Sequence, residues 1–422
     1  MTASQFTMLF VAMYALNVVL HFWLDARQIR HVRDHRDQVP AQFAGRIGLG
    51  AHQKAADYTI ARTRLGMLDE IIGIVLAFAL TLGGGLAWIY AIVSTLSPTI
   101  ASQPILRDLV LFIGYAVVAG AVSLPLSLYQ TFGVEAKYGF NKMTLRLWLI
   151  DAAKGIALAA ILGLPLAALV LWLMESSGSL WWLYAWLAWS AFQLLMLVLF
   201  PTLIAPLFNK FTPLAEGATK ARIEALLARC GFQSKGLFVM DGSKRSSHGN
   251  AYFTGFGASK RIVFFDTLLK TLAPQEVEAV LAHELGHFKR KHIIKRIAWM
   301  FAASLLFLWL LSVVIDQPWF YSGLGVPMSA GSHSNGMALL LFSIVVPLFT
   351  FPLSPLLSAY SRKHEFEADR YAAEQASADD LVQSLVKMYE DNASTLTPDP
   401  LHSAFYDSHP PAAVRIARLQ TG

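Results

Sequence analysis

Long apolar runs, each about the length needed to cross a bilayer, recur along this chain. A transmembrane α-helix needs about 20 consecutive and mainly apolar residues. Seven stretches meet that requirement, at residues 6–24, 68–96, 105–130, 145–174, 180–207, 293–315 and 337–360. Hydrophobic residues make up 55% of the chain, charged residues only 15%, and the mean hydropathy is +0.48. The pattern predicts a mainly α-helical protein that crosses the membrane seven times.

Basic residues alternate between the loops that connect these stretches. The loops at 97–104, 175–179 and 316–336 contain no lysine or arginine, whereas the loop at 25–67 contains eight. Because basic loops remain on the cytoplasmic side, we expect the amino terminus outside, in a periplasm or lumen. The first stretch has no basic residue before it and no evident cleavage site, so we interpret it as a retained anchor.

This topology divides the chain into four segments. Residues 1–208 hold five spans, 209–292 form a cytoplasmic insertion, 293–360 hold two more spans, and 361–422 form a cytoplasmic carboxyl-terminal segment. Within the insertion we expect a helix over 213–231 and strands at 237–240, 250–256 and 261–265. The last two strands would be joined as a hairpin through 257–260. An edge strand of such a sheet can pair with an extended peptide.

The segment His283-Glu284-Leu285-Gly286-His287 carries the clearest chemistry in the chain. Pro274 and the acidic residues after it indicate that a helix begins upstream and contains the motif. Residues i and i+4 share a helix face, so His283 and His287 can bind one zinc ion. Glu284 would lie beside the open coordination position, where water is activated. The spacing is typical of zinc peptidases.

A catalytic zinc ion needs a third protein ligand, and a second acidic stretch at 361–369 contains the best candidate, Glu365. Asp369 follows one turn later on the same face and can accept a hydrogen bond from a ligating imidazole. Glu367 points elsewhere on that helix. Taken alone, this stretch is equally well explained as a charged helix surface beside a membrane.

Together the two motifs resemble the type-I CAAX prenyl proteases, which are membrane-integral zinc metallopeptidases of the M48 family. Residues 247–256 and Ser408-His409-Pro410-Pro411 also resemble segments of that family. Gly249 departs from the resemblance, because relatives are expected to have a small polar residue there.

The resemblance implies a fold, a cofactor, a substrate and further site residues. It implies seven helices around an intramembrane chamber, capped by a gluzincin-like zinc metallopeptidase domain with a small β-sheet. It also implies one Zn2+ per chain, oxyanion stabilisation by His409, and contact of the substrate with Asn250, Ala251 and Tyr252. The implied substrates are prenylated proteins ending in a C-a-a-X sequence, which lose their last three residues.

Three other functions share parts of this pattern. A site-two-type protease that cuts within the bilayer is disfavoured, because a basic cluster belonging at the membrane surface follows His287, at Lys289, Arg290, Lys291 and Lys295. A transporter with a structural zinc domain is disfavoured, because a closed structural site gains nothing from Glu284. A metalloprotease for membrane-protein quality control or peptide processing, acting on non-prenylated substrates, stays open.

Other candidate features are assigned no catalytic role. His31 and His35 are also four residues apart, but arginines surround them, so we expect a surface that faces solvent or lipid headgroups. Cys230 is the single cysteine and is interpreted as a packing residue. The net charge of +6 follows the cytoplasmic loops, which indicates anionic membrane lipids and not nucleic acid as partners.

Overall fold

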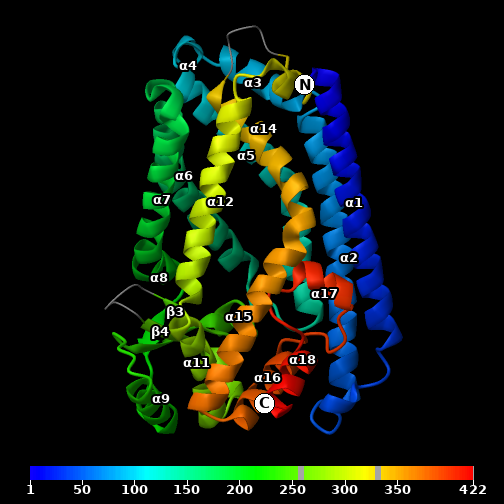
Figure 1. The fold of residues 1–422 in the computed structure, drawn as a ribbon, viewed down its shortest axis with the longest axis vertical. Helices are drawn as coiled ribbons and strands as arrows, with labels where there is room; N and C mark the ends of the chain where they lie inside the picture. The colour runs from blue at the N-terminus through cyan, green and yellow to red at the C-terminus, as the bar shows by residue number, and fades with distance from the viewer. Residues whose placement is uncertain (255–260, 328–333, 422) are drawn as a thin grey trace.

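The computed structural model describes residues 1–254, 261–327 and 334–421 (Figure 1). Long helices run along most of an elongated molecule, and a smaller domain with a β-sheet occupies one end. The amino terminus lies at the opposite end from this domain, and the carboxyl terminus lies within it.

The apolar stretches form the long helices. The first half of the chain contains α1 Ala3–Asp34, α2 Leu49–Leu80, α3 Gly85–Thr95, α4 Pro98–Ser102, α5 Pro104–Leu128, α6 Leu145–Ser176, α7 Trp181–Leu199 and α8 Ala205–Phe208. After the insertion come α12 His292–Val314, α13 Pro318–Ser322 and α14 Asn335–Thr350. Two π-helical segments, Tyr129–Glu135 and Phe200–Ile204, continue α5 and α7.

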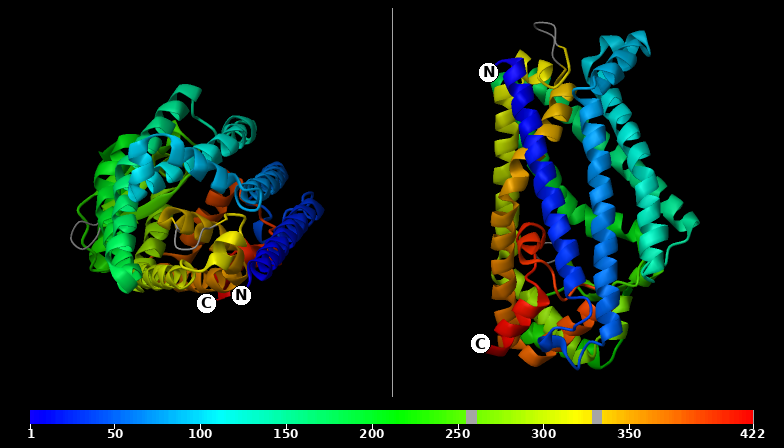
Figure 2. Two further views of the ribbon diagram at one scale, coloured as in Figure 1. Left: turned by 90° about the horizontal axis from the view of Figure 1, so that it is seen from above. Right: turned by 90° about the vertical axis from the view of Figure 1, so that its right-hand side faces the viewer.

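Seven long helices form a closed ring. Each contacts the next in the order α1, α2, α5, α6, α7, α12, α14 and back to α1, and α14 also contacts α5 and α6. Figure 2 shows the long helices from above. Within the described part of the chain, six segments are long and apolar enough to cross a membrane, and the bent pair of α2 and α3 adds a seventh. This number matches the seven stretches predicted from the sequence.

The predicted span at 68–96 is broken in the structure. The axes of α2 and α3 meet at 57°, and Gly84 between them has a φ of +75°, a conformation that favours glycine. A Cβ added at Gly325 would lie 2.5 Å from the carbonyl oxygen of Thr81, so another loop packs tightly against the break. Apolar composition alone did not reveal this bend, although three consecutive glycines mark it.

The insertion contains a four-stranded mixed sheet in the order β1-β2-β4-β3. Its strands are β1 Phe211–Pro213, β2 Leu237–Met240, β3 Ala251–Thr254 and β4 Arg261–Phe265. β2 pairs with β4 in parallel, and β3 pairs with β4 antiparallel, with Tyr252 opposite Val263. The predicted strands are present, and β3 is an edge strand of the sheet. The predicted connection at 257–260 and residues 255–256 lie outside the described residues.

Seven helices complete the domain around the sheet. They are α9 Ala218–Arg229, α10 Asp266–Thr271, α11 Pro274–Lys289, α15 Ser354–Gln375, α16 Ala378–Asp391, α17 Pro400–Tyr406 and α18 Ala412–Thr421. Apolar residues of α9, α11, α15, α16, β2 and β4 share one buried cluster. The start of α11 is capped by Glu276, whose carboxylate accepts a hydrogen bond from the amide of Ala273 at 2.7 Å.

Helices α11 and α15 lie side by side with an unusually close approach (Figure 1). A Cβ added at Gly286 would lie 2.9 Å from Cα of Ala368 and 3.1 Å from Cβ of Tyr371. Only glycine fits this position without a backbone shift, because the nearest atom belongs to the backbone of α15. Gly286, the fourth residue of the histidine motif, therefore sets the distance between α11 and α15.

We expect Gly286→Ala to lower the thermal unfolding midpoint of the purified protein, and Gly286→Val to lower it further. Overpacking costs about 1–3 kcal/mol, which offsets the gain of about 1 kcal/mol in helix propensity from glycine to alanine. Gly155→Ala in α6 is the matched control, because a Cβ at Gly155 meets no atom within 4 Å. Equal midpoints for Gly286→Val and the wild type would contradict the packing argument.

Candidate active site

Two histidines of α11 lie close together on the side of this helix that faces α15. Nε2 of His283 and Nε2 of His287 are 3.1 Å apart, and the ring planes are nearly perpendicular, at 81°. His283 is 7% exposed and His287 is partly buried. This geometry follows from the i, i+4 spacing on a helix, as the sequence predicts.

Glu365 of α15 completes a three-residue cluster with this pair. Its Oε2 lies 3.4 Å from Nε2 of His283, and its Oε1 lies 3.3 Å from Nε2 of His287. Glu365 is 3% exposed, and its Oε2 has no hydrogen-bond partner among the described residues. Within the described ranges, no other set of three histidine, cysteine, aspartate or glutamate residues is close enough to hold a metal ion.

The cluster fits a tetrahedral zinc ion. Ligand atoms at about 2.0–2.1 Å from zinc and at tetrahedral angles are about 3.3 Å from one another, and the three distances above are 3.1, 3.3 and 3.4 Å. Two nitrogens and a carboxylate are ligands that zinc accepts, and the buried, unpartnered oxygen of Glu365 suits a metal-binding role. The residues present therefore fit the metal.

His283 is held by a buried ion pair behind it. Its Nδ1 lies 2.8 Å from Oδ1 of Asp369, and Nε of Arg415 donates to Oδ2 of Asp369 at 2.9 Å. Burial alone would lower the pKa of His283, but the hydrogen bond to Asp369 and the nearby carboxylate of Glu365 outweigh it and raise the pKa to about 9. The surroundings thus stabilise a positive charge at this imidazole, and a bound zinc ion supplies that charge while leaving the ring neutral.

His287 is supported by a different pair of residues. Its Nδ1 lies 3.0 Å from Nδ1 of His292, the first residue of α12, and Nε2 of His292 lies 3.0 Å from Oε2 of Glu367. The ring of His364 stacks on His292 at 3.9 Å between centroids. Glu367 therefore does not face the cluster of ligands, as expected, but it reaches that cluster through His292.

His409 approaches the cluster from the loop between α17 and α18. Its Nε2 lies 3.5 Å from Oε1 of Glu365. The side chain is 64% exposed, yet surrounding protein displaces bulk water and lowers the pKa of the ring below its ordinary value. Both observations describe a side chain that faces an open space bordered by protein.

Arg362 connects the helix of Glu365 to the loop of His409. Its Nη1 donates to the carbonyl oxygens of Ser403 at 3.2 Å and Asp407 at 2.9 Å. Arg362 lies three residues before Glu365, so one turn of α15 holds both the candidate ligand and the support of the His409 loop. This support is absent from the sequence prediction.

Glu284 follows His283 on α11 and is partly buried. Because successive helix residues are about 100° apart around the axis, its carboxylate does not share the face that His283 and His287 share. It is therefore adjacent to the cluster without belonging to it.

The candidate substrate residues lie on the edge strand β3 and just before it. Asn250 is exposed, and its Oδ1 accepts a hydrogen bond from the amide of Ala251 at 2.8 Å. Ala251 packs against the buried core of the domain, while the hydroxyl of Tyr252 lies 3.9 Å from Sδ of Met240. Because the amide of Phe265 donates to the carbonyl oxygen of Asn250, the antiparallel alternation turns the main-chain groups of Tyr252 toward β4 and those of Ala251 toward the edge of the sheet.

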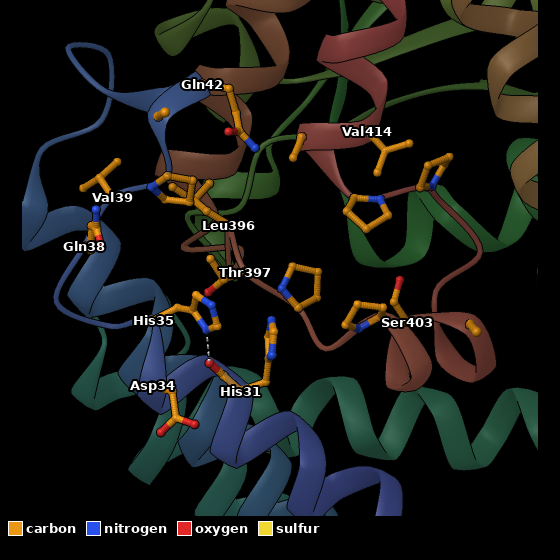
Figure 3. Close-up of a pocket in the computed structure, with 18 of the residues that line it drawn as sticks. His31, Asp34, His35, Gln38, Val39, Gln42, Leu396, Thr397, Ser403 and Val414 are labelled. Carbon is orange, nitrogen blue, oxygen red and sulfur yellow. Dashed lines mark hydrogen bonds between the residues drawn. The ribbon is translucent and has the colours of Figure 1, made fainter.

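A hollow of about 650 Å³ lies on the other side of the His409 loop, between the end of α1 and the carboxyl-terminal segment (Figure 3). Its lining includes His31 and His35, whose rings are 4.3 Å apart, together with Pro410 and Pro411. Among the described residues, no third metal-binding side chain joins the two histidines.

Three supporting residues escaped the sequence analysis: Arg415, His292 and Arg362. Each acts on a partner distant in the sequence, so no local spacing marks it. The only available signal was His292, which follows His287 by five residues and begins the next apolar stretch. A buried arginine and an imidazole at the start of a membrane helix both require partners, but the sequence does not name those partners.

Known proteins resemble this chain over most of its length. Residues 28–210 match the family described as CAAX prenyl protease N-terminal, five membrane helices, and residues 213–422 match Peptidase family M48. The chain is 34% identical over 416 residues to the CAAX prenyl protease 1 homolog of Oryza sativa subsp. japonica, which covers 96% of this chain and 95% of that relative. It is 39% identical over 312 residues to CAAX prenyl protease 1 of Saccharomyces cerevisiae. This match covers 71% of this chain and 68% of the yeast protein.

A solved structure has the same fold. The crystal structure of S. mikatae Ste24p superimposes with a TM-score of 0.91 at 30% sequence identity, covering 98% of this chain and 99% of that one. These matches confirm the prediction of a membrane-integral zinc metallopeptidase over that of a transporter. They also confirm the predicted mainly helical fold with a small sheet. The chain belongs to the CAAX prenyl protease 1 family of membrane-embedded M48 zinc metallopeptidases.

Proposed function

We propose that this protein hydrolyses a peptide bond near the carboxyl terminus of prenylated proteins that end in a C-a-a-X sequence, releasing the last three residues. The observation that carries the proposal is the convergence of His283, His287 and Glu365 at the end of a membrane-spanning helix. The names of the relatives, which are CAAX prenyl proteases over nearly the full chain, support this substrate class.

The position of the cluster relative to the apolar surface favours a lipid-anchored substrate. Leu356, Leu357 and Tyr360 on α15 are 70%, 48% and 48% exposed, as expected of side chains in contact with lipid. Tyr360 is five residues before Glu365, which is about 7–8 Å along a helix. A substrate held in the membrane by a prenyl group would thus present its adjacent peptide at the height of the cluster.

The arrangement of the helices supports an interior space between them. In a regular ring of seven helices with neighbours about 8–10 Å apart, each helix lies about 9–12 Å from the common axis, and this ring departs from that shape where α14 also contacts α5 and α6. Since a helix with its side chains has a radius of about 5–6 Å, such a ring leaves a central space. We propose that this space is the intramembrane chamber implied by the resemblance, with the zinc site at one end.

His283, His287 and Glu365 would hold one zinc ion, leaving a fourth position for water or substrate. When bound, the metal supplies a Lewis acid that polarises the substrate carbonyl and lowers the pKa of a water molecule. Asp369 keeps the Nδ1 proton on His283, so that Nε2 of this ring is free to bind the metal.

Glu284 would accept the proton of the attacking water and deliver it to the departing amine. Its position directly after His283 supports this role, because a carboxylate there is near the metal without being consumed as a ligand. One residue then serves as base and as acid, and no covalent intermediate is needed.

His409 would donate a hydrogen bond from Nε2 to the carbonyl oxygen as negative charge develops on it. Its Nε2 is 3.5 Å from Glu365, and the hydrogen bonds of Arg362 hold its loop against α15. Donors that are fixed before the reaction stabilise the transition state without reorganisation.

The edge strand β3 would align the substrate by main-chain pairing, with Asn250, Ala251 and Tyr252 as the contact residues. The unpaired edge of β3 supports this role, since β4 occupies only its other side. Main-chain pairing tolerates different side chains in the peptide.

We further propose that the catalytic domain lies in the cytoplasm and the amino terminus outside. The eight basic residues at 25–67 support this orientation, as does the lack of lysine and arginine in the loops at the opposite end.

We expect Glu284→Gln to reduce cleavage of a farnesylated C-a-a-X peptide by about 10²–10⁴-fold with the zinc content unchanged, because the variant removes a proton acceptor but no ligand. The products that the purified full-length protein forms from this peptide are identified by mass spectrometry. This measurement tests both the role of Glu284 and the proposed substrate. Equal cleavage of the same peptide without its farnesyl group would contradict the prenyl-substrate proposal and favour general peptide processing.

We expect His409→Ala to lower kcat by about 10²–10³-fold through loss of an oxyanion donor, with little change in zinc content. His35→Ala is a matched control, because His35 lies outside the ligand cluster. A change confined to KM in His409→Ala would show that the residue binds substrate and does not stabilise the transition state.

The orientation can be tested with single cysteines in a Cys230→Ser background. We expect Gln103→Cys, between α4 and α5, to react with a membrane-impermeant maleimide in intact cells or sealed vesicles with the external face outward. Ala44→Cys, in the basic loop, should react only after permeabilisation, and both positions are exposed. The reverse pattern would overturn the proposed topology.

A further inference from the structure

We propose that Glu367 and His292 are positioning residues that hold His287 in the one tautomer able to bind the metal. This inference rests on the proposed metal-binding role of His287 but not on the identity of the substrate. It concerns the hydrogen-bonded chain Glu367–His292–His287, which links the surface of α15 to α11 through the first residue of α12.

The proton positions along this chain follow from one requirement. To bind a metal through Nε2, His287 must carry its ring proton on Nδ1. That proton can only be donated to Nδ1 of His292, which is 3.0 Å away and must therefore be unprotonated. A neutral His292 then carries its proton on Nε2 and donates it to Oε2 of Glu367, also at 3.0 Å.

The carboxylate at the end of the chain selects between two proton arrangements. Ionised Glu367 can only accept a hydrogen bond, so it favours the tautomer of His292 that has its proton on Nε2. In the opposite tautomer, Nδ1 of His292 would donate to Nδ1 of His287, and the proton of His287 would move to Nε2. That arrangement would place a proton where the metal binds.

Burial makes this selection effective. His292 is 2% exposed, so water does not compete for its ring nitrogens. His364 stacks flat on the ring, with centroids 3.9 Å apart and planes at 12°, which limits its rotation. Glu367 is 32% exposed in its side chain and thus retains contact with solvent that stabilises its charge.

The two candidate histidine ligands are therefore held by different means. His283 donates directly to Asp369, whose charge is balanced by Arg415. His287 is oriented through an intervening neutral ring. Because Glu365, Glu367 and Asp369 all belong to α15, one helix provides a candidate ligand and the support of both histidines.

The test measures zinc affinity of the full-length protein by competition with a fluorescent chelator. Removing support behind a metal-ligating histidine costs about 10–100-fold in metal affinity. We expect a loss of this size for His292→Phe, which keeps an aromatic ring but no acceptor, and for Glu367→Leu. Glu367→Gln can still present an acceptor oxygen to Nε2 of His292, but its amide can also donate there, so we expect a loss smaller than that of Glu367→Leu.

Matched controls distinguish loss of the Glu367–His292–His287 hydrogen bonds from general effects of substitution. His35→Phe makes the same change in a histidine outside the cluster, and Glu374→Leu makes the same change at an exposed position of α15. Both should bind zinc as the wild type does. The thermal midpoint of the zinc-free protein should be similar in Glu367→Leu and Glu374→Leu, because the proposed role is to orient a ligand.

Wild-type zinc affinity in both His292→Phe and Glu367→Leu would overturn the proposal. Equal losses in Glu367→Gln and Glu367→Leu would also overturn it, since negative charge and not hydrogen-bond acceptance would then be responsible. If His292→Phe fails to fold, the comparison of the two Glu367 variants decides the question. A wild-type protein that binds zinc but does not cleave prenylated peptides would refute the proposed substrate while leaving this test intact.

Discussion

The close approach of α11 and α15 is the constraint on which the rest of the site depends. At Gly286, the two backbones are so near that a Cβ would lie 2.9 Å from Cα of Ala368. This contact brings Glu365 to within 3.3–3.4 Å of both histidine Nε2 atoms, although about 80 residues and two membrane helices separate the two motifs. The motif on α11 thus contributes both histidines of the cluster and the small residue that admits Glu365.

Helix α15 joins the chemistry of the site to the membrane. Its first half continues the last apolar span and exposes large hydrophobic side chains, whereas its second half is acidic and buried against α11. Because a helix is stiff over this length, the height of Glu365 relative to the apolar surface is determined by the span itself. A peptidase built in this way is suited to substrates that are themselves anchored in the membrane.

Charged side chains around the cluster have specific polar partners. Asp369 is paired with Arg415, and Arg362 satisfies main-chain carbonyls next to the His409 loop. Pairing of this kind is required, because an isolated buried charge is strongly destabilising. The same interactions orient His283 and hold the loop of His409. These side chains therefore contribute both to folding and to the geometry of the site.

The sequence alone determined the features that depend on local periodicity. Apolar runs identified seven membrane stretches, the i, i+4 histidines identified a metal-binding face, and the acidic stretch with Glu365 and Asp369 completed the set of candidates. The short strands at 237–240 and 261–265 were also evident from composition. Such features are readable because each arises from residues within one or two turns of one another.

Tertiary structure decided the features that join distant segments. The parallel pairing of β2 with β4, the bend between α2 and α3, and the partners of Arg415, His292 and Arg362 all depend on contacts between elements far apart in the chain. A side chain's type indicates that it needs a partner, but the partner is selected by packing. For this reason the candidate ligands could be named from the sequence, whereas the residues that hold them in place could not.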